Sequence, residues 1–344
     1  MDNLCHSLVG ATMSGAGLRR RTALATVTMV IGANLPDVDA IVYLVGDNAD
    51  GLAFRRGWTH GVLAMVIWPF VLTAIMYAIG LAIERRRVRR KRPVSRIPLR
   101  ASQLLLVSAL SIWSHPLFDL LNTYGVRLLM PFSPTWFYGD TLFIVDPWVW
   151  CALGIGTTLS LRRARKVPVG AETATVMARV HRPARVALMA VAAYIAVMAA
   201  TSRIGRVIVE RQAVAAGLPP SSRVMVAPEA VTPFRRSVIR DLNRSYELGT
   251  LTWSFSPRYA PSTAVFPALA PASPVYASAL RTRQGRRFLL WSRFPFSDPD
   301  VPDARATVRL DDARYASPGR AGFPAVIIPI TAPVTAPPPV TPQP

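Results

Sequence analysis

The first two hundred residues alternate long apolar runs with short basic segments. Residues 61–83 contain no charge, and residues 186–202 form a second, shorter apolar run. A helix needs about 20 mainly apolar residues to cross a bilayer. The pattern therefore predicts five transmembrane helices, at 23–45, 61–83, 102–122, 142–161 and 186–202. Prolines and ionisable residues interrupt the first, third and fourth of these. A shorter helix, at about 4–18, precedes them and either spans the membrane or lies in the interface.

The distribution of positive charge predicts the orientation of these helices. The chain has a net charge of +21, and nineteen of the Lys and Arg residues before residue 203 fall in three blocks, at 19–21, 85–100 and 162–185. Basic loops stay on the cytoplasmic side of a membrane. The apolar runs then cross in pairs, and everything after residue 203 lies outside. The partner expected is the lipid bilayer of a bacterial inner membrane, not nucleic acid, although "ERRRVRRKRPVSR" leaves a nucleic-acid role open.

The C-terminal part has a different pattern. Short apolar or alternating runs bounded by prolines are typical of strands, and four occur here: "SRVMVAPEAV", "LGTLTWSFS", "RRFLLWSRF" and "FPAVIIPIT". The predicted fold class is mainly α, a polytopic transmembrane helical bundle over 1–202 followed by a small β-rich extracytoplasmic domain over 203–330. Residues 331–344 are expected to be a Pro-rich disordered tail.

Eight ionisable residues lie in or beside the apolar runs. Charge inside a bilayer is costly and usually faces a protein interior or a cavity. On the predicted topology these residues converge on the outer face, His6 among them if the first segment crosses the membrane. They are His6, Asp37, Asp39, His60, His115, Asp119, Asp140 and Asp146.

Their chemistry indicates a divalent metal site, because histidine nitrogens and carboxylate oxygens are the ligands of zinc and similar ions. His115 and Asp119 share a helix face if the helix persists through Pro116. Asp37 and Asp39 share a face if their stretch is extended. Helix capping is an alternative role for Asp140 and Asp146, and His181, in the third basic block, is expected at the surface.

Several motifs resemble a family of bacterial inner-membrane proteins described as predicted metal-dependent hydrolases, some of whose relatives are linked to the LexA damage-response regulon. The resemblance covers about residues 1–165, and its motifs are "HSLVGA", "GANLPDVD", "FRRGWTHG", "HPLFDLLNTYGVRLLMPFS" and "WFYGDTLFIVDP". That family is grouped distantly with zinc-dependent phospholipase C and P1-type nucleases. The resemblance implies metal ligands at His6, Asp37, Asp39, His60, His115 and Asp119. Arg56 stands where many members have a histidine, so one potential ligand is missing.

The function expected is that of a membrane-bound metal-dependent hydrolase acting on a lipid or lipid-linked phosphoester at the outer face, with zinc as the expected metal. The metal would activate water, with Asp119 or Asp140 as general base. Arg56 and Arg127 are the candidate anion-binding residues. Two other functions stay open: an ion or small-molecule transporter, and an inactive membrane anchor whose β domain binds a partner.

Overall fold

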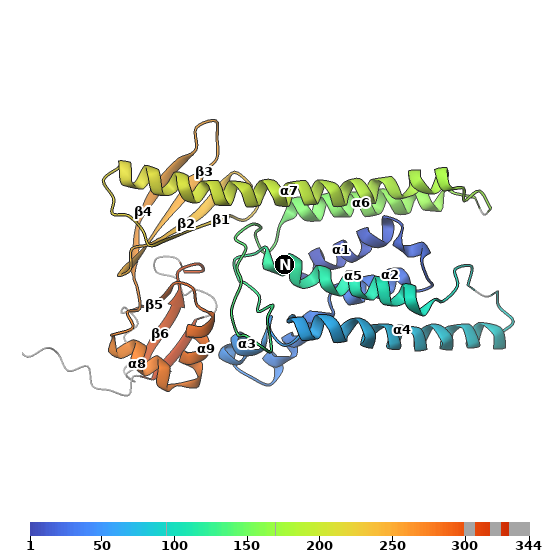
Figure 1. The fold of residues 1–344 in the computed structure, drawn as a ribbon, viewed down its shortest axis with the longest axis horizontal. Coiled ribbons are helices and arrows are strands. Elements are labelled where there is room, and N and C mark those ends of the chain that lie inside the picture. The colour runs from blue at the N-terminus through green and yellow to red at the C-terminus, as the bar shows by residue number, and fades with distance from the viewer. Residues whose placement is uncertain (94, 169, 299–306, 317–324, 330–344) are drawn as a thin grey trace, which may run out of the picture.

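The computed structural model describes residues 1–344 except 94, 169, 299–306, 317–324 and 330–344 (Figure 1). The expected Pro-rich tail, 331–344, lies outside the described residues. The named elements up to residue 215 are all helices, joined by loops such as 121–146, and the long helices run roughly parallel (Figure 1). The elements are α1 (Asn3–Gly15), η1 (Leu18–Arg20), α2 (Ala25–Gly32), η2 (Leu35–Leu44), α3 (Asn48–Phe54), α4 (Val62–Arg89), α5 (Ala101–Leu120), α6 (Pro147–Arg165) and α7 (Ala174–Ala215).

Among the described residues, three helices are long and apolar enough to cross a membrane: α4, α5 and α7. A fourth span exists if α2 and η2, bent by 46° at their junction, act as one. The run expected at 142–161 is not among these, because α6 begins only at Pro147 and carries three arginines in its last turn. α1 has 13 residues, fewer than a spanning helix needs.

Two prolines have different effects on the membrane part. Pro36 follows the end of α2, where the chain bends into the 3-10 helix η2. The interruption expected in 23–45 is therefore confirmed. The stretch is helical, however, so the extended conformation in which Asp37 and Asp39 would share a face does not occur. Pro116 lies inside α5 without ending it, which keeps His115 and Asp119 on one helix face.

The position of His181 also differs from the prediction. It was expected at the surface, but only 4% of it is exposed. It lies on α7, where its Nδ1 donates to the carbonyl oxygen of Gly15 at 2.8 Å and joins the end of α1 to α7. Asp146 takes the alternative, capping role, because its carboxylate accepts from the backbone N–H groups of Trp148 and Val149.

The C-terminal part contains two antiparallel sheets. The first has the order β1 (Arg223–Pro228), β2 (Arg235–Asp241), β3 (Ser245–Thr252) and β4 (Arg258–Pro267). The end of α7 packs on it through Val209, which contacts a buried cluster on the sheet (Figure 1). The second sheet joins β5 (Pro295–Asp298), β6 (Thr307–Asp312) and β7 (Val326–Pro329), beside α8 (Pro274–Arg281) and α9 (Arg283–Trp291).

The expected strand "RRFLLWSRF" is mostly helix α9. Thr282 caps this helix by accepting from the N–H of Gly285, and Phe288 and Trp291, three residues apart, bury one face. They join a core cluster that includes Ala49 and Leu52 of α3. The second sheet is thus packed against the membrane part, next to the segment that carries the candidate site.

Two glycines of α6 allow a matched test of helix packing. A Cβ at Gly156 would lie 2.3 Å from the Cβ of Ala187 on α7, whereas a Cβ at Gly154 would meet no atom within 4 Å. We expect Gly156→Ala to lower stability by about 1–3 kcal/mol through overpacking, and Gly154→Ala to raise it slightly through helix propensity. Thermal melting of the purified variants in detergent checks this, and equal melting temperatures would contradict the α6–α7 packing.

Candidate metal centre

Four side chains from three segments meet in the membrane part. Asp37 comes from η2, His60 from the turn before α4, and His115 and Asp119 from α5. One ligand atom of each lies within 4.8 Å of the others. The two histidines and Asp119 are fully buried, and the side chain of Asp37 is 7% exposed. The structure thus brings together four of the six residues predicted as metal ligands.

The bend at Pro36 explains the orientation of His115. A helix carbonyl normally accepts from the N–H group three or four residues later. For Ala33 the donor three residues on is Pro36, which has no N–H, and the N–H of Asp37 bonds to Asn34 instead. The Ala33 carbonyl is therefore free to accept from His115 Nδ1 at 2.6 Å.

His60 is oriented by a neighbouring carboxylate. The hydroxyl of Thr59 donates to Asp39 Oδ2 at 2.9 Å, so it has no proton left for His60 Nδ1, which lies 2.9 Å away. His60 Nδ1 is also 3.3 Å from Asp39 Oδ2. The proton of the neutral imidazole is thus on Nδ1. Gly61 permits this turn, because a Cβ there would lie 2.4 Å from the Met130 carbonyl oxygen.

In this neutral tautomer both imidazoles present Nε2 lone pairs, and these two atoms lie 3.1 Å apart. Two lone pairs at this distance repel each other unless a shared proton or a metal ion lies between them. Asp119 Oδ2 lies 3.4 Å from His60 Nε2 and 3.5 Å from His115 Nε2. In the described part of the chain this buried oxygen accepts no hydrogen bond.

Five of the six distances between the ligand atoms, from 3.1 to 3.8 Å, are close to those around a small divalent ion, and all four atoms lie within 4.8 Å of one another. Asp37 Oδ1 lies 3.8 Å from His60 Nε2 and 3.7 Å from His115 Nε2. A tetrahedral ion with bonds of about 2.0–2.2 Å holds its ligand atoms roughly 3.3–3.6 Å apart. With two nitrogens and two carboxylate oxygens, the group suits zinc or a similar ion, and the residues present fit the expected cofactor class.

Asp39 supports the group from outside it. Besides facing His60, its carboxylate accepts from the backbone N–H of Arg56 at 2.8 Å and from Arg55 Nε at 3.2 Å. A carboxylate that faces the second ring nitrogen of a metal-binding imidazole, as Asp39 faces Nδ1 of His60, orients that ring. Asp37 is therefore the ligand candidate of the pair, and Asp39 positions His60.

His6 lies against the group without belonging to it. Its ring stacks on His115 with centroids 3.7 Å apart, and its Nε2 is 3.4 Å from Asp119 Oδ1. This nitrogen is buried and has no hydrogen-bond partner among the described residues.

The two arginines expected to bind substrate are held by the protein. Arg56 has a left-handed backbone, with φ of 52°, that turns its side chain inward. Its guanidinium contacts Asp119 Oδ1 at 3.1 Å and Asn122 Oδ1 at 3.1 Å. Arg127 donates to the carbonyl oxygens of Ala53 and Arg55. These contacts support Asp119 and the 53–57 turn, respectively.

The two candidate general bases, Asp119 and Asp140, both have other partners in the structure. Asp119 belongs to the ligand group. Asp140 is buried elsewhere, at the junction with the C-terminal part, where its carboxylate pairs with Arg293 at 2.8 Å and Arg206 at 3.2 Å. The structure therefore does not bring Asp140 into the group.

A cavity of about 480 Å³ lies beside the site, and it is lined by Arg55 and Arg56, by β1 and β2, and by Arg314. Arg55 was missed by the sequence analysis. Its side chain is 23% exposed and contacts Asp37 Oδ1 at 3.0 Å. The sequence offered one clue to Arg55, its position next to Arg56 in "FRRGWTHG". It offered no clue to Arg314, which lies almost 200 residues beyond Asp119.

Arg314 is neutralised within the cavity wall. Burial raises the pKa of Asp312, but the adjacent Arg314 guanidinium more than offsets this and holds that pKa at about 2. Arg314 also donates to the carbonyl oxygen of Thr123 at 2.7 Å. Arg55 also pairs with carboxylates, Asp37 at 3.0 Å and Asp39 at 3.2 Å, but its side chain is the most exposed of the three cavity arginines.

The helices and this group define the class: a helical membrane protein with a buried two-histidine, two-aspartate site suited to a divalent ion. The family model for the YdjM inner membrane protein matches residues 1–204. The chain belongs to that family, and the matched part contains all four ligand candidates. The expected resemblance to a bacterial inner-membrane family is thereby confirmed.

One relative is the "Uncharacterized protein YfhP" of Bacillus subtilis (strain 168), which is 24% identical over 157 residues. The match covers 43% of this chain and 43% of that protein, so the chain spans less than half the length of this relative. No solved structure matches.

We expect the full-length protein, purified from membranes without chelator, to contain a bound divalent metal. His60→Gln and His115→Gln should abolish it, because each removes a ligand nitrogen. Asp39→Asn should weaken metal affinity roughly 10- to 100-fold through loss of orientation. Elemental analysis after size-exclusion chromatography measures this.

His181→Gln is the matched control, because it removes a buried histidine outside the group, and it should keep the metal. Wild-type protein that binds neither zinc nor manganese would contradict the site.

Proposed function

We propose that this protein is a membrane-bound metal-dependent hydrolase that cleaves a phosphoester at the outer surface of the inner membrane. The observation that carries the proposal is the pair of imidazole Nε2 atoms, 3.1 Å apart, that face two carboxylates beside an arginine-lined cavity. A divalent ion held by Asp37, His60, His115 and Asp119 would lower the pKa of a water molecule and polarise a phosphoryl oxygen.

The surrounding residues have distinct roles in this proposal. Asp39 keeps the His60 proton on Nδ1, and Arg56 fixes the orientation of Asp119. Arg55, at the cavity, would bind the substrate phosphate, for which a guanidinium is well suited. With Asp119 in the ligand group and Asp140 paired to arginines, His6 is the nearest buried base with an unpartnered nitrogen, and Nε2 is our candidate proton acceptor.

A lipid substrate is supported by the apolar surface next to the cavity. η2, which carries Asp37, exposes Ile41 and Leu44, and Val45 follows it; the last two are 81% and 86% exposed. The cavity itself includes Tyr43 from the same helix and the apolar side chains Phe143 and Ile144. A phosphoester attached to a membrane lipid could thus reach Asp37 along η2 while its apolar part stays in lipid.

The orientation follows from charge. α4 begins beside the metal group and ends with Arg86, Arg87 and Arg89, so the group and the basic segments lie towards opposite ends of this helix (Figure 1). If basic segments are cytoplasmic, the group and the C-terminal sheets face outward.

The test is hydrolysis of lipid phosphoesters by the full chain in nanodiscs loaded with zinc or manganese. We expect phosphate or phosphoalcohol release that His60→Gln and Asp37→Asn abolish. Arg55→Gln should lower kcat/KM roughly 10- to 100-fold, the value of a hydrogen bond to a charged group, while metal content is retained. Arg89→Gln, on the basic end of α4, is the charge-matched control and should be unchanged.

Metal-loaded protein that hydrolyses no phosphoester would contradict the proposal. Ion flux in proteoliposomes that the same substitutions abolish, without hydrolysis, would favour transport.

A further inference from the structure

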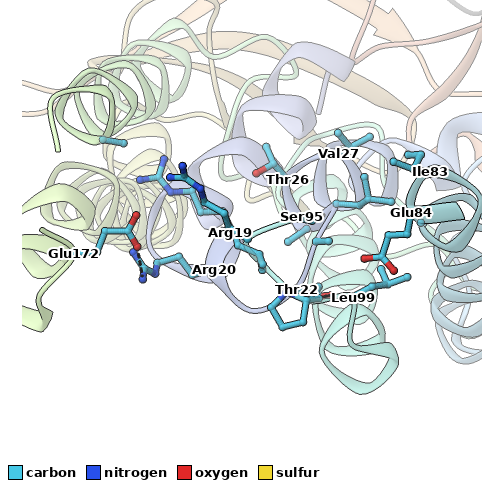
Figure 2. Close-up of a pocket in the computed structure, with 18 of the residues that line it drawn as sticks. Arg19, Arg20, Thr22, Thr26, Val27, Ile83, Glu84, Ser95, Leu99 and Glu172 are labelled. Atoms are coloured by element: carbon cyan, nitrogen blue, oxygen red, sulfur yellow. Dashed lines mark hydrogen bonds and ion pairs between the residues drawn. The ribbon is translucent and has the colours of Figure 1, made fainter. Parts of the chain in front are cut away.

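A second cavity lies towards the opposite end of α4 from the metal group. Its volume is about 640 Å³, and it is enclosed by η1, the start of α2, the end of α4, the segment 95–99 and the end of α6 (Figure 2). The hydrolase proposal involves none of the residues that line it, so the function of this cavity is a separate question.

Arginines dominate the charged lining of this cavity. Four arginines and two glutamates contribute to its wall. Arg20 pairs with Glu172 at 3.0 Å, and Glu84 lies on the opposite side of the view (Figure 2). Within the described ranges, Arg19, Arg87 and Arg96 form no ion pair. With four arginines and two glutamates in its wall, the cavity has an excess of positive charge.

The pKa of Arg19 reflects this burial and concentration of positive charge. Burial lowers the pKa of Arg19, and the neighbouring charge of Arg20 lowers it further. An anion in the cavity would offset both effects, because opposite charge favours the protonated form.

The other part of the wall is apolar. Val27 of α2 is 51% exposed and Ile83 of α4 is 36% exposed, and both face the cavity region (Figure 2). Leu99 approaches α4 so closely that a Cβ at Gly80 would lie 2.7 Å from its side chain. One helical turn separates Ile83, at the end of the apolar run, from Arg87. The cavity thus crosses the boundary between the apolar core and the basic surface.

We propose that this cavity binds the head group of an anionic phospholipid from the leaflet on the basic side of the membrane. The phosphate would lie among Arg19, Arg87 and Arg96, because guanidinium groups bind phosphate oxygens through paired N–H donors. The acyl chains would follow Val27 and Ile83. Basic pockets between membrane helices on the cytoplasmic side bind lipid head groups elsewhere. Glu84 would accept hydrogen bonds from head-group hydroxyls such as those of phosphatidylglycerol.

The experiment uses the full-length protein in a neutral detergent, titrated separately with phosphatidylglycerol, phosphatidylcholine and inorganic phosphate. Native mass spectrometry counts bound lipid, and thermal melting gives an independent measure. We expect phosphatidylglycerol to bind at least tenfold more tightly than phosphatidylcholine, and phosphate to compete only weakly. The double variant Arg87→Gln/Arg96→Gln should lose roughly tenfold or more of the phosphatidylglycerol affinity.

Arg89→Gln/Arg90→Gln is the matched control. It removes the same charge from the same basic segment, from residues that do not line the cavity, and should keep the preference. Equal affinity of the wild type for both lipids would overturn the proposal, as would an equal loss in the control variant. Inorganic phosphate that binds as tightly as phosphatidylglycerol would show a free-anion site and overturn the lipid assignment.

Discussion

Two histidine nitrogens that face each other at 3.1 Å are the constraint on which the candidate site depends. Neither ring can relieve the repulsion by moving its proton, because both Nδ1 atoms are committed, one to the Ala33 carbonyl and the other to Thr59 and Asp39. In a buried, low-dielectric setting such a pair is costly without a cation. The arrangement therefore has the character of a preformed binding site.

The break between α2 and η2 fixes the orientation of one of these two histidines, His115. A continuous helix through "GANLPDVD" would use the Ala33 carbonyl internally, and no acceptor would remain to fix His115. Pro36 frees that carbonyl near the start of the 3-10 helix η2, which places Asp37 near Nε2 of both histidines and Asp39 near Nδ1 of His60. Broken helices are tolerated at membrane depth where protein surrounds them. Here the break places one ligand candidate, Asp37, and frees the carbonyl that orients another, His115.

The convergence of Asp37, His60, His115 and Asp119 could be predicted from the sequence, because ionisable residues inside apolar runs are costly unless they meet in the protein interior. The different roles of Asp37 and Asp39 could not, since the 3-10 geometry that divides them depends on tertiary contacts. Arg56 was expected to face the substrate in place of Arg55, and only the left-handed backbone at Arg56 shows which one turns inward. Helix α9 was taken for a strand, because a short apolar run does not by itself reveal its period.

The C-terminal sheets were expected as a separate domain, yet they help to enclose the space beside the site. Residues of β1 and β2, with Arg314, form one wall of the cavity whose other wall carries Arg55. The family match ends at residue 204, so the ligand candidates lie inside it and this wall lies outside. In the proposed function the helical part holds the metal, and the C-terminal part shapes what reaches it.

X-ray absorption spectroscopy at the edge of the bound metal, on the purified full-length protein, tests the metal site most directly. We expect a first shell of nitrogen and oxygen at about 2.0–2.2 Å, with the outer-shell scattering of two imidazole rings. Sulfur scattering at about 2.3 Å, or a shell without imidazole, would contradict it.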